Sequence, residues 1–221
     1  MKRIALALVI CLAIASLACA EVLVTANPMG KGQMGWLAGG RYDMSSVANQ
    51  NSYSAGGYLG YGLMDNLDLY GKLGYGIGAN PLAGQTINGI MAGAALKYTF
   101  VKEGKDMPVT LAVAGGYQST TTTVNAGASM QMVTGDLGIG IIASKVMVPY
   151  VPYGAVNYHS LNSNAPFLGT STGSMIEIAG GTQLLLSKST AVIGELCYQS
   201  ITSGGATTNN TQVSLAYSAK I

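Results

Sequence analysis

Alternation with a period of two residues is the feature that most constrains how this chain can fold. From about residue 34 onward, one phase of each segment carries apolar and aromatic side chains, and the other carries small, polar or charged ones. This alternation is typical of β-strands whose two faces meet different surroundings. We expect ten such strands, which begin near residues 34, 53, 67, 90, 109, 133, 150, 176, 192 and 213.

The scarcity of charge narrows the choice of β fold. Charged residues make up 9% of the chain, whereas soluble domains carry about a quarter. Beyond the first twenty residues, the sequence has no apolar run of the length that a membrane-spanning helix needs. Because only helices and closed barrels satisfy their backbone hydrogen bonds in lipid, we predict an all-β fold: a closed antiparallel transmembrane β-barrel over residues 34–221.

The aromatic residues indicate which phase faces lipid. Tyr53 and Tyr61 lie eight residues apart in one phase, as do Tyr150 and Tyr158, and eight residues of a tilted strand span roughly 20 Å of membrane. A soluble sandwich or lipocalin-like barrel is the alternative, but it would place charge outside and apolar residues inside. The predicted aromatic girdle comprises Trp36, Tyr42, Tyr53, Tyr61, Tyr75, Tyr98, Phe100, Tyr117, Tyr150, Tyr158 and Tyr198.

Charged residues within the predicted strands fall on the opposite phase, which faces the lumen. They are Arg41, Asp43, Asp68, Lys72, Lys97, Asp136, Glu177 and Glu195. Buried charges need partners or water, so these residues form either a salt-bridged filled core, which we favour, or the lining of a small pore. We expect Arg41, Lys72 or Lys97 to reach Glu177 or Glu195, which lie on neighbouring strands.

The two phases predict different responses to substitution. Arginine at Leu137 or Ile139, on the lipid-facing phase, is expected to destabilise the barrel by about 2–4 kcal/mol. Serine at Gly138 or Thr134, on the lumen phase, is expected to change stability little.

The connectors between the predicted strands fall into two classes. "MDN", "KEGKD", "SKVM" and "SKST" are short and carry charge, whereas residues 45–52, 78–88, 119–128, 160–173 and 201–210 are longer and rich in Ser, Thr, Asn and Gly. Outer-membrane barrels have short periplasmic turns and longer outer loops. We therefore expect the first class to face the periplasm and the second to face outward.

The first twenty residues are typical of a secretory signal peptide. Lys2 and Arg3 precede an apolar stretch, and Ala18-Cys19-Ala20 forms a small-residue cleavage site. A membrane anchor and a lipoprotein acylated at Cys19 are the alternatives. Residues 21–33 are then a periplasmic N-terminal lead, which contributes a strand or a plug.

Removing this segment changes the charge and the cysteine count. The formal charge falls from 11 − 9 = +2 to 9 − 9 = 0, because Lys2 and Arg3 are lost. No basic surface then supports a nucleic-acid partner. Cys197 is the remaining cysteine, so an intramolecular disulfide is not expected.

Little in the sequence indicates catalysis. His159 is the single histidine, on the lumen phase near the outer end of its strand, beside Ser160. No Asp or Glu is adjacent to it in the sequence to orient it as a base. We interpret it as a rim histidine and expect no enzyme activity, no metal site and no cofactor, since zinc and calcium spacings are also absent from the sequence.

The predicted signal peptide, the hairpin "YLGYGLMDNLDLYGKLGYG" and the final strand "TQVSLAYSAKI" together resemble the small bacterial outer-membrane β-barrel proteins, the opacity-porin-like group. The resemblance implies residence in the bacterial outer membrane, with membrane lipid and the barrel-insertion machinery as partners. Such proteins usually end in an aromatic residue, whereas this chain ends in Ile221. We expect a monomer.

The functions of that group range from adhesion and envelope stability to narrow pores and a few enzymes. Three classes of function therefore stay open for this chain. A structural or surface-interaction barrel is the first choice, a narrow channel for small solutes is the second, and a rim enzyme is the third. The sequences of the loops do not indicate a particular surface ligand.

Overall fold

The computed structural model describes residues 25–45, 51–80, 85–125, 129–165 and 169–221. The predicted signal peptide therefore lies outside the described residues. Within the described ranges, no helix is long and apolar enough to cross a membrane. The ten strands are β1 (Met34–Ser45), β2 (Asn51–Met64), β3 (Leu67–Asn80), β4 (Gln85–Val101), β5 (Thr110–Asn125), β6 (Ser129–Ser144), β7 (Tyr150–Ala165), β8 (Gly169–Leu185), β9 (Thr190–Ser203) and β10 (Ala206–Lys220).

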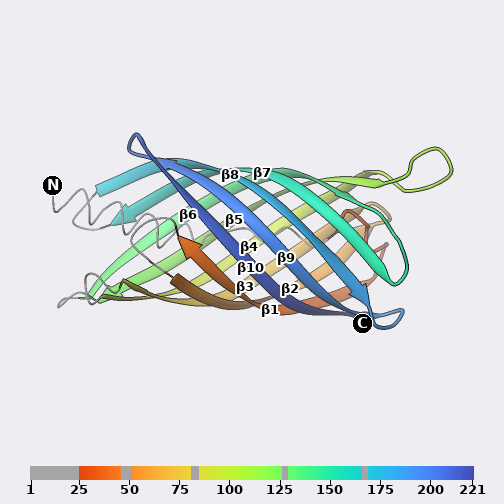
Figure 1. The fold of residues 1–221 in the computed structure, drawn as a ribbon, viewed down its shortest axis with the longest axis horizontal. Coiled ribbons are helices and arrows are strands. Elements are labelled where there is room, and N and C mark those ends of the chain that lie inside the picture. The colour runs from red at the N-terminus through yellow and green to blue at the C-terminus, as the bar shows by residue number, and fades with distance from the viewer. Residues whose placement is uncertain (1–24, 46–50, 81–84, 126–128, 166–168) are drawn as a thin grey trace.

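The strands form one closed antiparallel barrel, which confirms the predicted fold (Figure 1). Each strand pairs with the next, and β1 pairs with β10 through partners such as Trp36 and Ala219. Closure leaves no unpaired strand edge. We call the end where β1 begins and β10 ends the base of the barrel, and the opposite end the rim.

The outer wall is apolar, as the alternation predicts. Leu73 is 67% exposed, Leu137 61% and Leu215 65%, and all three project outward. A surface of this kind in water would be a severe aggregation hazard, but it matches the lipid-facing band of a transmembrane barrel. The chain is accordingly a membrane-spanning barrel of the outer-membrane type.

Aromatic side chains on the outer wall gather toward the two ends of the strands. Trp36 and Tyr217 pack together toward the base, with ring centroids 5.6 Å apart. Tyr42 and Tyr53 pack toward the rim, with centroids 4.9 Å apart. The base belt contains Trp36, Tyr61, Tyr98, Phe100, Tyr150 and Tyr217, and the rim belt contains Tyr42, Tyr53, Tyr75, Tyr117, Tyr158 and Tyr198.

The loop ranges expected at the rim need correction, because strands continue into them. β5 runs through the threonine-rich stretch to Asn125, and β7 runs to Ala165. β-branched threonine favours strands, and the ladder persists there, for example between Thr121 and Val133. The outward residues of these extensions are polar, so the wall projects past the rim belt. At the base, residues 102–109 form a longer connector than residues 204–205 do at the rim.

Residues 25–33 enter the base of the lumen as an irregular segment, not as an eleventh strand. Ala26 is fully buried in a cluster that includes Ala112, Ile142 and Tyr153. The chain then leaves the lumen through Gly30 and Gly32, whose φ values of 94° and 75° suit glycine. The described part of the N-terminal lead therefore lies at the base of the barrel and adds no strand to its wall.

Candidate functional site in the lumen

The charged residues predicted to face the lumen all project inward. Arg41, Asp43, Asp68, Lys97, Asp136 and Glu177 are at most 4% exposed, and Lys72 and Glu195 are half-buried. The strand period alone produces this placement, because successive side chains alternate between the two faces of the wall. Which residues meet depends on strand register.

At the base, Lys97 on β4 lies 3.3 Å from the carboxylate of Asp68 on β3. The register pairs these two residues directly across the ladder. The Tyr70 hydroxyl donates a hydrogen bond to the same carboxylate at 3.2 Å. Both charges are buried and hydrogen-bonded, which is the condition under which a buried ion pair is tolerated.

Toward the rim, Arg41 and Asp43 form a second ion pair along one strand. Arg41 Nε lies 3.1 Å from an Asp43 carboxylate oxygen, and both side chains are almost fully buried. The Ser52 hydroxyl donates to the same carboxylate at 3.1 Å from the neighbouring strand β2. Arg41 and Asp43 are two residues apart on β1, so their side chains lie on the same face of the strand.

Amide side chains surround Glu177, which does not follow the predicted pattern of acid and base. Asn157 and Gln199 donate to its two carboxylate oxygens at 2.7 and 2.8 Å. Gln212 continues the chain by donating to Gln199 at 2.9 Å. These amides lie on the neighbouring strands β7 and β9 and on β10 beyond. Among the described residues, the hydrogen bonds to Glu177 therefore come from adjacent strands and not from a base that reaches across the lumen.

Glu195 lies away from Glu177, although the two strands are neighbours. The register places Glu177 beside Gln199 and Glu195 beside Gly181, four residues further along β8. The two carboxylates therefore do not face each other across the ladder. Glu195 instead accepts a hydrogen bond from the Tyr153 hydroxyl at 2.7 Å.

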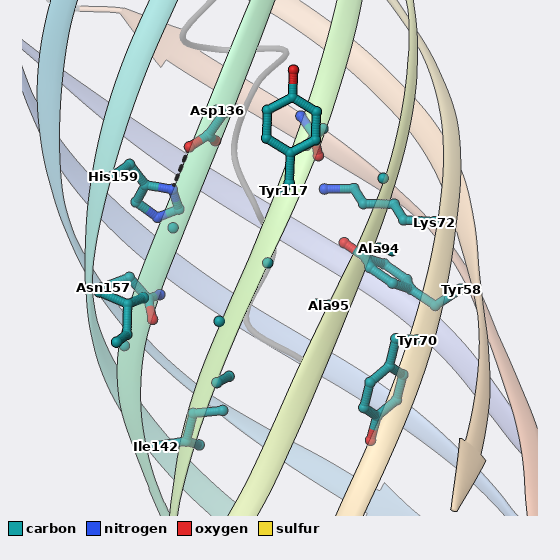
Figure 2. A pocket seen from close by; sticks show the side chains of 18 residues that line it. Tyr58, Tyr70, Lys72, Ala94, Ala95, Tyr117, Asp136, Ile142, Asn157 and His159 are labelled. Carbon is teal, nitrogen blue, oxygen red and sulfur yellow. Dashed lines mark hydrogen bonds and ion pairs between the residues drawn. The ribbon is translucent and has the colours of Figure 1, made fainter. Parts of the chain in front are cut away.

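His159 is a buried lumen residue and not the rim residue that its sequence position indicated. Its side chain is 2% exposed, and Nδ1 lies 2.9 Å from the carboxylate of Asp136 on the adjacent strand β6. Figure 2 shows this pair on one side of a lumen cavity. No carboxylate is adjacent to His159 in the sequence, and Asp136 reaches it through the pairing of β6 with β7.

The imidazole ring of His159 lies over Gly138, which corrects the expected tolerance of that position. A Cβ atom on Gly138 would lie 2.8 Å from two atoms of the ring. Serine there would displace the ring and strain its bond to Asp136. The His159–Asp136 pair therefore needs a residue without a side chain at position 138.

The cavity beside this pair is small, at about 60 Å³. Lys72 and Tyr58 lie on its other side (Figure 2), with the Lys72 ammonium 5.4 Å from the centre of the Tyr58 ring. Glycines and alanines of β4, β5 and β6 form the wall between the two sides. A space of this size accommodates a few water molecules.

The histidine pair alone does not make an active site. Within the described residues, Nε2 of His159 has no hydrogen-bond partner, whereas nucleophilic catalysis requires a nucleophile within reach of the base. The described residues also contain no group of three or more His, Cys, Asp or Glu side chains that could hold a metal ion.

Sequence reasoning missed the neutral residues of the lumen. Asn157, Gln199 and Gln212 make most of the contacts around Glu177, and Thr25 and Asn27 offer main-chain oxygens to Lys97. Strand alternation places the three amides on the inward phase, but the predicted lumen site included charged residues only. The contacts of residues 25–29 could not be predicted, because these residues show no periodic pattern in the sequence.

No protein-family model and no curated protein sequence matches the chain. Among solved structures, it is similar to the outer membrane protease OmpT from Escherichia coli, with a TM-score of 0.54, 10% identity, and 92% of this chain and 100% of that chain covered. The translocator domain of the autotransporter NalP from Neisseria meningitidis gives a TM-score of 0.53 at 12% identity, covering 87% of this chain and 90% of that one. The β domain of the Bordetella autotransporter BrkA gives 0.50 at 10% identity, covering 87% and 100%.

These similarities are similarities of fold alone. They support the assignment of the chain as a barrel of the outer-membrane type, which its closed sheet and apolar wall independently require. At 10–12% identity, they carry no statement on whether this chain has the protease or translocator activities in those names.

Proposed function

We propose that this protein is an integral outer-membrane barrel with a structural or surface-interaction role, and that its lumen does not conduct. The observation that carries the proposal is the occupation of the lumen by the protein's own polar groups. Ion pairs lie near both ends, an amide chain surrounds Glu177, and residues 25–29 occupy the base. The cavities in the middle have volumes of only about 60 and 30 Å³.

The surface role is supported by the strand extensions beyond the rim belt. Their outward residues are uncharged and hydrogen-bonding, among them Thr121, Ser160, Asn162 and Thr202. A polar wall above the aromatic belt belongs in water and not in lipid. In this orientation the rim faces outside, the base faces the periplasm, and the extensions form the part of the protein that an external partner would contact.

Conductance of the refolded protein in planar bilayers tests the closed lumen. We expect no stepwise current from the wild-type chain. A narrow channel is the second candidate, and the lumen charges predict its selectivity. Among the eight charged residues that face the lumen from the strand interiors, three bases (Arg41, Lys72, Lys97) face five acids (Asp43, Asp68, Asp136, Glu177, Glu195), a difference of 3 − 5 = −2. A cation-selective current in the wild type would reject the closed barrel and establish the channel.

Cysteine labelling tests the orientation independently. A cysteine at Thr121, on the outward face of the β5 extension, should react with a membrane-impermeant maleimide on intact cells. A cysteine at Asp106, in a base connector, should react only after the outer membrane is permeabilised. Cys197 is 3% exposed and should stay silent in both. The reverse labelling would overturn the orientation.

A further inference from the structure

The base of the lumen binds residues 25–29 through their main chain. Lys97 Nζ donates to the carbonyl oxygens of Thr25 and Asn27 at 2.9 and 2.7 Å. Thr99 Oγ1 donates to the carbonyl oxygen of Ala26 at 2.8 Å. Three consecutive carbonyl groups of the segment are thus bound by two side chains of β4.

The amide groups of the segment are bound in the same way. The amide of Ala26 donates to Ser144 Oγ on β6 at 3.1 Å, and the amide of Met29 donates to both carboxylate oxygens of Asp68 on β3 at 3.1 Å. Pro28 lacks an amide hydrogen. No side chain of residues 25–29 makes a hydrogen bond to the described part of the barrel.

Two side chains of the segment have shape requirements. Ala26 is 0% exposed within a packed cluster, so a small residue is required there. Met29 lies against Gly35 and Gly60, where an added Cβ would come within 2.8 Å of its sulfur and methyl atoms. The missing side chains of these two glycines form a hollow that a long unbranched residue fills.

We propose that the base is a peptide-binding site, occupied in this structure by residues 25–29 and able to accept a separate polypeptide. The ligand is a short segment with free main-chain groups, a small residue, and a long unbranched apolar residue three positions later. Covalent connection to the barrel plays no part in these contacts, because every hydrogen-bonding group on the barrel side comes from β3, β4 or β6. A cavity of about 310 Å³ beside Asn27, Pro28 and Met29 provides room for a longer chain. This peptide-binding site does not depend on whether the lumen conducts.

The test uses the full chain with Ala26→Trp, which is too large for the site and displaces the protein's own segment. A dye-labelled peptide of residues 21–33 is titrated against this variant in detergent micelles, with binding followed by fluorescence anisotropy. We expect saturable binding to Ala26→Trp. The wild type should bind at least about tenfold more weakly, because its own segment competes at a high effective concentration.

Matched variants identify the site. Adding Lys97→Met to Ala26→Trp should weaken binding at least about tenfold, since hydrogen bonds from a charged group are among the strongest. Adding Lys105→Met, an exposed lysine in the base connector 102–109 and outside this cavity, should leave binding unchanged. A peptide with N-methyl groups on Ala26 and Met29 should not bind. Absence of binding to Ala26→Trp, equal binding by both lysine variants, or full binding of the methylated peptide would each overturn the site.

Hydrogen exchange keeps the test decisive if Ala26→Trp does not refold. In the wild-type chain, the amides of Ala26 and Met29 should exchange slowly. Lys97→Met should accelerate both, whereas Lys105→Met should accelerate neither. Equal exchange in the two lysine variants would contradict a segment held by Lys97.

Discussion

Replacement of Gly138 by alanine tests the packing of the lumen most directly. The new Cβ would lie 2.8 Å from two atoms of the His159 ring, and ordinary contact begins at 3.4 Å, so the ring must move by about 3.4 − 2.8 = 0.6 Å to restore ordinary contact. The hydrogen bond from the ring to Asp136 is 2.9 Å long and fully buried. A displacement of this size breaks or severely strains it.

Two opposing effects set the expected change in the free energy of unfolding. Loss of a buried hydrogen bond to a charged group costs about 1.5–3 kcal/mol. Alanine in a strand offsets about 0.5–1 kcal/mol of this, because glycine loses more conformational entropy on folding. We therefore expect Gly138→Ala to lower the free energy of unfolding by about 1–2 kcal/mol.

Equilibrium urea unfolding in detergent micelles, followed by Trp36 fluorescence, measures this change. Gly71→Ala is the matched control, because Gly71 faces outward and an added Cβ there meets no atom within 4 Å. We expect Gly71→Ala to be neutral or stabilising by up to about 1 kcal/mol. In a His159→Ala background the penalty of Gly138→Ala should disappear, since the two positions are coupled. Equal stability of the two glycine variants, or an undiminished penalty without the ring, would refute the reasoning.

Four further substitutions test other parts of the barrel, three by equilibrium unfolding and one by amide exchange. Leu137→Arg should destabilise the protein in lipid vesicles by about 2–4 kcal/mol, whereas Thr121→Arg, above the rim belt, should change stability by less than about 0.5 kcal/mol; similar effects would contradict the assigned lipid boundary. Glu177→Gln should cost about 1–3 kcal/mol, because two amide donors lose charged acceptors, and an unchanged midpoint would show that these bonds contribute nothing. Gly62→Ala should displace the chain at Gly30, whose carbonyl lies against Gly62, and accelerate amide exchange across residues 30–33; unaltered exchange would place that turn elsewhere.

The sequence alone determined which face of the wall each strand residue occupies. Leu137 faces lipid and Asp136 faces the lumen because a strand has a period of two, and one phase is apolar along the part of each strand between the two aromatic belts. The closed barrel followed from the same pattern, because a sheet surrounded by lipid must pair every edge. These inferences need only local alternation and the chemistry of the membrane.

The tertiary structure decided which residues meet. Asp136 binds His159, and Glu177 binds Asn157 and Gln199, because the register of paired strands brings them together, and register depends on the whole closed sheet. The position of residues 25–29 could not be predicted from the sequence either. The barrel binds their main-chain groups, and those groups are the same in every sequence. Periodicity therefore assigned the two faces of the wall, while strand register and main-chain contacts assigned the partners inside it.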